Sequence, residues 1–127
     1  YILSVHGEKN YPFRKVPSTL DIGLADGAGD DEFLDAVELG LRSIQEFQPD
    51  YIFYQMGVDP LKEDVLGKLN VTHEGLIQRD RLVLSYCHRN QIPVSLALGG
   101  GYAKPIEASV VAYANTYRVA KEIYFSS

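Results

Sequence analysis

Hydrophobic positions along the chain fall into short apolar runs that alternate with stretches of helical periodicity. Four runs have the length and character of strands, at residues 1–5, 20–24, 51–56 and 92–98. Apolar residues spaced three or four apart predict three helices, at residues 31–46, 73–89 and 106–123. Strands that alternate with helices and lack polar alternation indicate a parallel sheet with helices on both faces. The expected fold class is α/β, a three-layer α-β-α architecture with a mostly parallel, Rossmann-like sheet.

Local signals define several element ends. The glycine- and aspartate-containing segment 25–30 is a turn that leads into the first helix. Pro49 ends that helix. Thr72 has the chemistry of an N-cap for the second helix, with Glu74 in its first turn.

The chain opens at Tyr1 inside an apolar run, with no initiator Met and no polar leader. We therefore expect residues 1–127 to be a portion of a single larger domain. Part of a doubly wound sheet would expose the edge and faces of its first strand. Self-association of the isolated chain is the expected result.

Composition narrows the class of protein. The 127 residues are 46% hydrophobic and 23% charged, which is typical of a globular domain. A net charge of −5 argues against a nucleic-acid partner, which would need clustered Lys and Arg. No apolar run approaches the roughly 20 residues of a membrane span, and no signal peptide is recognisable. We expect a soluble, cytoplasmic protein with no membrane partner.

Open parallel sheets bind ligands beyond the carboxyl ends of their strands. Three loops occupy such places, at residues 6–18, 57–71 and 99–105. Asp59 follows the third strand directly, and its carboxylate is a suitable ligand for a divalent cation. The alternative, which spacing alone favours, is that Asp59 begins a turn with Pro60.

The fourth strand ends in Gly99-Gly100-Gly101-Tyr102. Glycines there let the backbone approach a ligand closely, and the Tyr102 phenol could donate a hydrogen bond to an oxyanion. A glycine-rich turn with a packed aromatic remains equally open. A dinucleotide site is excluded because the G-x-G-x-x-G pattern is absent.

The remaining polar candidates favour structural interpretations. His6 at a strand end is expected to be a hydrogen-bonded structural residue, and Cys87 a buried thiol. His73 and His88 are expected at the surface. The acidic clusters are expected to be solvated loop and capping charges; they comprise Asp26, Asp30, Asp31, Glu32, Glu63 and Asp64.

Five short motifs occur in an order and spacing that cover essentially the whole chain. They are Leu3-Ser4-Val5-His6-Gly7; Lys9-Asn10-Tyr11-Pro12-Phe13; Leu20-Asp21-Ile22 with 26–30; Gly57-Val58-Asp59-Pro60-Leu61 with Asp64 and 66–67; and Gly99-Gly100-Gly101-Tyr102. Together they resemble the histone deacetylase-like enzymes, of the class IV type, in the arginase–deacetylase superfamily. Residues 1–127 would then be the carboxyl-terminal portion of one deacetylase-like domain.

The resemblance implies roles for particular residues. Asp59 matches the second carboxylate ligand of the family's zinc ion. Tyr102 matches the catalytic tyrosine that hydrogen-bonds the acyl carbonyl. Gly100 and Gly101 match glycines that line the substrate channel, and Tyr11 falls where an aromatic lines the acyl-lysine tunnel.

A second metal is implied at the first strand. The backbone carbonyls of Ser4 and Val5 match positions that hold a monovalent cation, K⁺, in several relatives. Leu61 replaces the carboxylate that a binuclear arginase-type site needs, which disfavours that branch of the superfamily.

The implied activity is zinc-dependent hydrolysis of acyl-lysine or a related acylated amine. The family's first carboxylate ligand, its His ligand and its His pair have no counterpart in this chain, which is therefore expected to be inactive alone. The alternative hypothesis is a non-catalytic Rossmann-like binding or assembly module.

Overall fold

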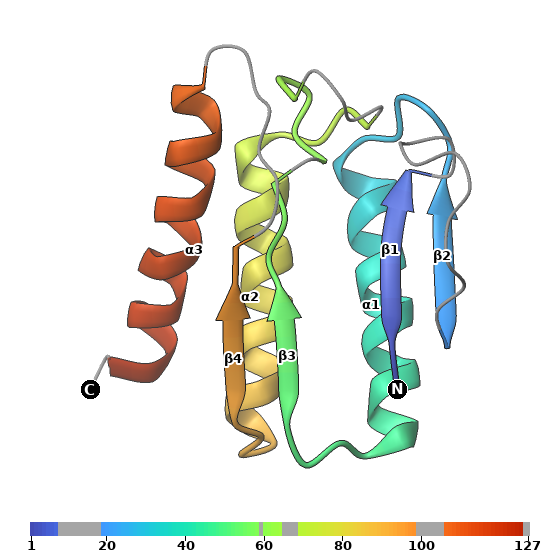
Figure 1. The fold of residues 1–127 in the computed structure, drawn as a ribbon, viewed down its shortest axis with the longest axis vertical. Coiled ribbons are helices and arrows are strands. Elements are labelled where there is room, and N and C mark those ends of the chain that lie inside the picture. Colours follow the sequence, from blue (N-terminus) through green and yellow to red (C-terminus); the bar gives the residue numbers. More distant parts are fainter. Residues whose placement is uncertain (8–18, 59, 65–68, 99–105, 126–127) are drawn as a thin grey trace.

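The computed structural model describes residues 1–7, 19–58, 60–64, 69–98 and 106–125 (Figure 1). The described elements follow one another as strands and helices in the order the hydrophobic pattern predicts. They are β1 (Leu3–Gly7), β2 (Leu20–Leu24), α1 (Asp30–Phe47), β3 (Ile52–Gln55), α2 (His73–Arg89), β4 (Val94–Ala97) and α3 (Glu107–Phe125).

The strands form two parallel pairs. β1 pairs with β2, in a register that places Leu3 opposite Leu20 and Gly7 opposite Leu24. β3 pairs with β4, with Ile52 opposite Val94. All four strands point the same way, so their carboxyl ends lie at one end of the molecule (Figure 1).

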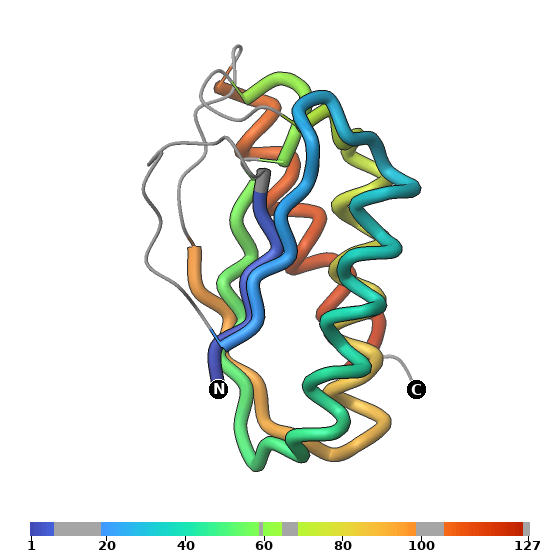
Figure 2. The backbone as a smooth tube through the Cα atoms, turned by 90° about the vertical axis from the view of Figure 1, so that its right-hand side faces the viewer, coloured from blue at the N-terminus to red at the C-terminus, as the bar shows by residue number. Residues whose placement is uncertain are grey.

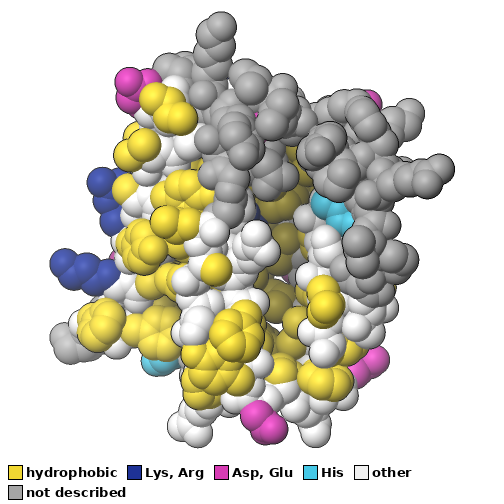
Figure 3. All heavy atoms as spheres, viewed as in Figure 1, with side chains coloured by type: hydrophobic (Ala, Val, Ile, Leu, Met, Phe, Trp, Pro, Cys, Tyr) yellow, Lys and Arg dark blue, Asp and Glu magenta, His cyan; other side chains and the backbone are white. Residues whose placement is uncertain are grey.

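The described helices and strands form two layers (Figure 2). α1 and α2 lie behind the strands in Figure 1, and α3 packs against α2. Burial in β3 alternates, and the side chain of Phe53 is 82% exposed. Figure 3 shows hydrophobic side chains on this open strand face. Within the described residues, the predicted helical cover is therefore present on one face of the strands.

The core lies between the strands and the helical layer. On α1, the spacing of Phe33, Ala36, Val37 and Gly40 builds one buried stripe, as expected for an amphipathic helix. Gly40 allows β1 to approach closely, because a Cβ there would lie 2.7 Å from Cδ2 of Leu3. These contacts attach the β1–β2 pair to α1.

The predicted helices agree closely with the structure, whereas three of the four strands differ from prediction at both ends. α2 begins after Thr72, whose Oγ1 accepts a hydrogen bond of 3.1 Å from the Gly75 amide, as its capping chemistry predicted. β1 begins and ends two residues later than the apolar run 1–5, at Leu3 and Gly7, because it pairs with Leu20–Leu24 of β2. β3 and β4 are shorter than their apolar runs; Ile92, for example, donates its amide to the Cys87 carbonyl instead of joining a ladder. Among the described helices, none is long and apolar enough to cross a membrane.

Candidate functional site

The carboxyl end of β3 lies at the predicted ligand edge (Figure 1). The Met56 amide donates to the Ala97 carbonyl at 3.1 Å and so joins the strand end to β4. Beyond Gly57, the Leu61 amide donates to the Val58 carbonyl at 3.1 Å and closes a turn. Val58 and Leu61 are both fully buried. The backbone on either side of position 59 is therefore anchored in the core.

The segment after this turn is held against the start of α2. Leu61 and Val71 form a short parallel bridge, in which the Val71 amide donates to the Pro60 carbonyl at 3.1 Å. Asp64 donates its amide to the Leu61 carbonyl at 3.0 Å, and its side chain is only 5% exposed. The expectation that Asp64 is a solvated loop charge is thus wrong, because this turn folds back onto the core.

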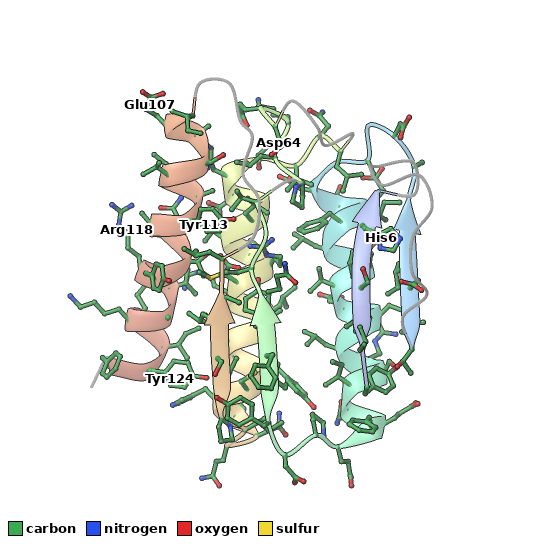
Figure 4. All side chains as sticks on the ribbon, in the orientation of Figure 1. His6, Asp64, Glu107, Tyr113, Arg118 and Tyr124 are labelled. Atoms are coloured by element: carbon green, nitrogen blue, oxygen red, sulfur yellow. The ribbon has the colours of Figure 1, made fainter. Side chains whose placement is uncertain are left out.

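β1 carries the predicted monovalent-cation positions in its first three residues. Ser4 and Val5 lie side by side in this strand, opposite Asp21 and Ile22 of β2. The Ser4 hydroxyl lies 2.8 Å from Nδ1 of His6, which confirms that His6 is a hydrogen-bonded residue. Figure 4 shows His6 near the carboxyl end of β1, at the end of the molecule where Asp64 also lies. K⁺ binding by the two carbonyls stays a prediction.

The other predicted site residues lie outside the described residues; they are Tyr11, Asp59, Gly100, Gly101 and Tyr102. Their roles stay predictions. Within the described ranges, no group of three or more His, Cys, Asp and Glu side chains could hold a metal ion. Catalytic zinc normally has three protein ligands. The described residues do not by themselves fit a zinc ion.

A buried polar network, which the sequence reasoning missed, lies directly behind the end of β3. Asp80 of α2 accepts hydrogen bonds from the hydroxyls of Tyr54 and Thr116, each at 2.5 Å. It also accepts from Nε and Nη2 of Arg79 at 3.1 and 3.0 Å. Arg79 donates its remaining terminal nitrogen, Nη1, to the carbonyl of Gly57. The network joins β3, α2 and α3.

The electrostatics of this network keep its phenol neutral. Burial raises the pKa of Tyr54 far above its usual value of 10; the opposing effect of the Arg79 charge is smaller, and the nearby Asp80 charge raises the pKa further. The neutral phenol remains a donor to Asp80 at all ordinary pH values. The guanidinium carbon of Arg79 also lies 5.6 Å from the centre of the Tyr54 ring, within cation–π range.

Helical spacing held a signal for this network. Leu76, Asp80 and Leu84 lie four residues apart, and neighbours at that spacing share one face of a helix. All three are buried. A carboxylate on an apolar face needs hydrogen-bond donors, so Asp80 could have been recognised as the centre of a buried cluster.

Asp30 acts at a helix start, as expected of a capping charge, whereas His73 differs from expectation. Asp30 accepts hydrogen bonds from the Thr72 amide at 2.8 Å and from the Thr72 hydroxyl at 2.5 Å, so it links the starts of α1 and α2. His73 is half-buried and its Nδ1 has no hydrogen-bond partner within the described part of the chain, although a surface position was expected. His88 is exposed and Cys87 is buried, as predicted.

Comparison with known proteins identifies the family. The family model for the histone deacetylase domain matches residues 1–117. The chain belongs to the histone deacetylase family. It is 41% identical over 125 residues to an uncharacterized protein of Picosynechococcus sp., covering 98% of this chain and 42% of that protein. It is 30% identical to histone deacetylase 2 of Arabidopsis thaliana, covering 82% of this chain and 28% of that protein.

Solved structures of histone deacetylase relatives share the fold. An HDAC homologue from Aquifex aeolicus superimposes with a TM-score of 0.73 and 28% identity, over 97% of this chain and 39% of that one. An acetylpolyamine aminohydrolase from Burkholderia pseudomallei gives a TM-score of 0.81 at 19% identity, over 95% of this chain and 37% of that one. The chain thus has the arginase–deacetylase fold as a partial domain, and it spans less than half the length of these relatives.

Proposed function

We propose that the protein to which this chain belongs is a zinc-dependent deacetylase that hydrolyses acyl-lysine or a related acylated amine. In this proposal, Asp59 is one zinc ligand and Tyr102 is the catalytic phenol. The 127-residue chain alone is inactive, because one carboxylate is too few protein ligands for a catalytic zinc.

The observation that carries the proposal is the anchored turn at the end of β3. The family's ligand motif, Gly57 to Leu61, falls on this turn, and its described flanks Val58 and Leu61 are fully buried. A metal ligand needs such a rigid support, because small displacements of a side chain that contacts the metal weaken metal binding strongly. The strand-end position also agrees with where open parallel sheets bind ligands.

The chemistry assigned to this chain is binding and charge stabilisation. The Tyr102 hydroxyl donates a hydrogen bond to the acyl carbonyl oxygen as negative charge develops on it. Gly100 and Gly101 allow the substrate to approach the backbone, and Tyr11 contacts the alkyl stem of the substrate. Zinc, when bound, supplies Lewis-acid polarisation and an activated water.

The substrate class rests on the relatives. One similar structure is an HDAC homologue complexed with SAHA, at 27% identity and a TM-score of 0.72, and another is the acetylpolyamine aminohydrolase. Both names are compatible with an acylated amine as substrate. An acyl-lysine peptide and an acetylated polyamine are therefore the two substrates to compare.

The test uses protein expressed from its complete coding sequence. We expect hydrolysis of an acetyl-lysine peptide or an acetylpolyamine that stops when a chelator removes zinc and returns when zinc is restored. Tyr102→Phe is expected to lower kcat by roughly 10²- to 10³-fold, the usual loss for one oxyanion donor. Asp59→Asn is expected to lower the zinc content of the purified protein.

Matched controls separate these effects from damage to the fold. Tyr117→Phe removes the hydroxyl of a tyrosine that is 51% exposed on α3, and Asp26→Asn changes an exposed acid. Both should leave kcat and zinc content unchanged. A folded complete protein that binds no zinc and hydrolyses neither substrate would instead favour the non-catalytic binding module.

A further inference from the structure

Arg79 and Asp80 form a buried ion pair directly behind the carboxyl end of β3. Arg79 is 6% exposed and Asp80 is 1% exposed. They are consecutive residues of α2, and consecutive residues of a helix do not normally face each other. Both Nε and Nη2 of Arg79 nevertheless reach the same oxygen, Oδ1 of Asp80. The guanidinium is therefore turned back along the helix surface and held there.

Asp80 is itself held in place by two other elements. Tyr54 of β3 donates to its Oδ1, and Thr116 of α3 donates to its Oδ2. The Thr116 side chain is fully buried. With donors at both oxygens, the carboxylate has little freedom to rotate, so it fixes the orientation of the guanidinium that it binds.

The third contact of Arg79 is with the strand end. Nη1 donates to the carbonyl oxygen of Gly57, two residues past the end of β3. One residue earlier, the Met56 amide donates to the Ala97 carbonyl and links the strand end to β4. A charge-assisted hydrogen bond thus holds the backbone just beyond the point where the sheet stops.

The downstream side of the same turn is held in a different way. Val58 and Leu61 are buried in the core and are joined by a backbone hydrogen bond. Val71 fixes Pro60 through its amide. Within the described residues, Arg79 holds the first residue of the segment 57–61 through a side-chain hydrogen bond to its carbonyl.

A buried ion pair is seldom retained for stability, because apolar residues of similar volume often serve equally well. Here the ion pair orients the guanidinium, and a planar guanidinium with fixed donors determines where the carbonyl that it binds must lie. We propose that Arg79, oriented by Asp80, is a positioning residue for the turn 57–61. This inference rests on the proposed function in one respect, namely that the turn carries a zinc ligand at position 59.

The test compares Arg79→Met with Arg81→Met in protein expressed from its complete coding sequence. Arg81 lies on the same helix but pairs with Glu122 at 2.9 Å on the surface, where the two side chains are 42% and 58% exposed. Zinc affinity is measured by competition with a chromophoric chelator. We expect Arg79→Met to weaken zinc binding by about 10- to 100-fold, the usual loss when a group supporting a metal ligand is removed. Arg81→Met is expected to change it less than about twofold.

Arg79→Lys serves as the second variant. Lysine keeps the positive charge and one donor nitrogen but lacks the planar guanidinium with its several fixed donors. We therefore expect a zinc affinity between those of the wild type and Arg79→Met. If Arg79→Met does not fold, Arg79→Lys decides alone. Wild-type zinc affinity in a folded Arg79→Met or Arg79→Lys protein would overturn the proposal.

Hydrogen exchange separates this inference from the proposed function. In Arg79→Met, we expect faster exchange at the amides of Val58 and Leu61, with exchange at the amides of β1 unchanged. This result would support positioning even in a wild-type protein that binds no zinc, whereas unchanged exchange at both amides would overturn it. If the wild-type protein binds no zinc, that result counts against the proposed function only.

Discussion

Asp80 is a charged side chain whose donors come from three separate elements. Its partners are Tyr54 on β3, Arg79 on α2 and Thr116 on α3. Removing the carboxylate would take the Asp80 counter-charge away from Arg79, which is only 6% exposed. We expect Asp80→Ala to lower the free energy of unfolding by about 3–5 kcal/mol, measured by urea titration.

The matched control for Asp80 is Glu122, the acidic partner in the exposed pair with Arg81. Exposed pairs contribute roughly 0–1 kcal/mol, so Glu122→Ala should change the urea midpoint little. Equal effects of the two substitutions would show that the Asp80 network contributes no more than a surface pair.

Cys87 gives a second prediction at the residue scale, this time for pH. Burial raises the pKa of the Cys87 thiol from 9.0 to about 11. The unfolded chain therefore loses this proton before the folded chain does. Stability from this group is complete below pH 9 and falls as pH rises from 9 toward 11.

Iodoacetamide labelling checks this behaviour, because only the thiolate reacts. At pH 8 we expect labelling of folded protein to be at least about tenfold slower than labelling in urea, since both burial and a raised pKa oppose it. A native labelling rate equal to that in urea would contradict a buried Cys87.

At the scale of elements, one carboxylate couples the starts of two helices. Asp30 begins α1, and its side chain binds the amide and hydroxyl of Thr72, the N-cap of α2. Gly75 is essential to this junction. A Cβ at position 75 would lie 2.2 Å from Oδ1 of Asp30 and 2.8 Å from Cγ1 of Val71.

We expect Gly75→Ala to lower the free energy of unfolding by about 1–3 kcal/mol through overpacking. This loss occurs even though Ala favours an isolated helix by about 1 kcal/mol over Gly. Thermal or urea unfolding gives the measurement. An increase in stability would show that the junction accommodates the added methyl group without strain.

A double-mutant cycle with Asp30→Ala identifies the cause. Asp30→Ala alone should destabilise by about 1 kcal/mol, as expected when a capping interaction is lost. In that background the atom nearest the new Cβ is gone, so Gly75→Ala should cost less than it does in the wild type. Additive effects would place the clash at Val71 instead.

Helices were predicted more accurately than strands because their signals are local. Capping by Thr72 and the periodic stripe containing Phe33 and Val37 can be recognised within one helix. Strand ends depend on a partner strand. Tyr1 and Ile2 are as apolar as the residues of β1, yet the structure begins the strand at Leu3, opposite Leu20.

The site was predictable only in part, for a related reason. Motifs around Asp59 and Tyr102 are contiguous in sequence and could be matched directly. The Asp80 network depends on Tyr54, 26 residues away, and on Thr116, 36 residues away. Only the packing of α2 against β3 and α3 brings those hydroxyls together, and no local pattern specifies it.

At the scale of the whole molecule, the strand face away from the helices is apolar and open. Phe53 is 82% exposed there, and its ring centre lies 5.0 Å from that of Tyr51, which is 47% exposed, with the rings tilted at 45°. Ile2 and Leu98 are also largely exposed. We expect the 127-residue polypeptide, produced alone, to self-associate through this face, as measured by sedimentation velocity.

Phe53→Ser should shift that polypeptide toward monomer. Phe125→Ser is the matched control, because Phe125 is also 82% exposed but lies at the end of α3. A concentration-independent monomer in the unchanged polypeptide would contradict the prediction. An equal response to both substitutions would indicate non-specific hydrophobic association and not association through the strand face.

The two strand pairs also differ in the time at which each can form. Leu3 pairs with Leu20, whereas Ile52 pairs with Val94, which follows it in the chain only after the whole of α2. Closing the longer interval costs more chain entropy, and on a ribosome β4 emerges well after β3. During synthesis, β1, β2 and α1 can therefore assemble while β3 still has a free edge. The strand end that Arg79 and Asp80 hold is among the last parts of the described chain to take its final shape.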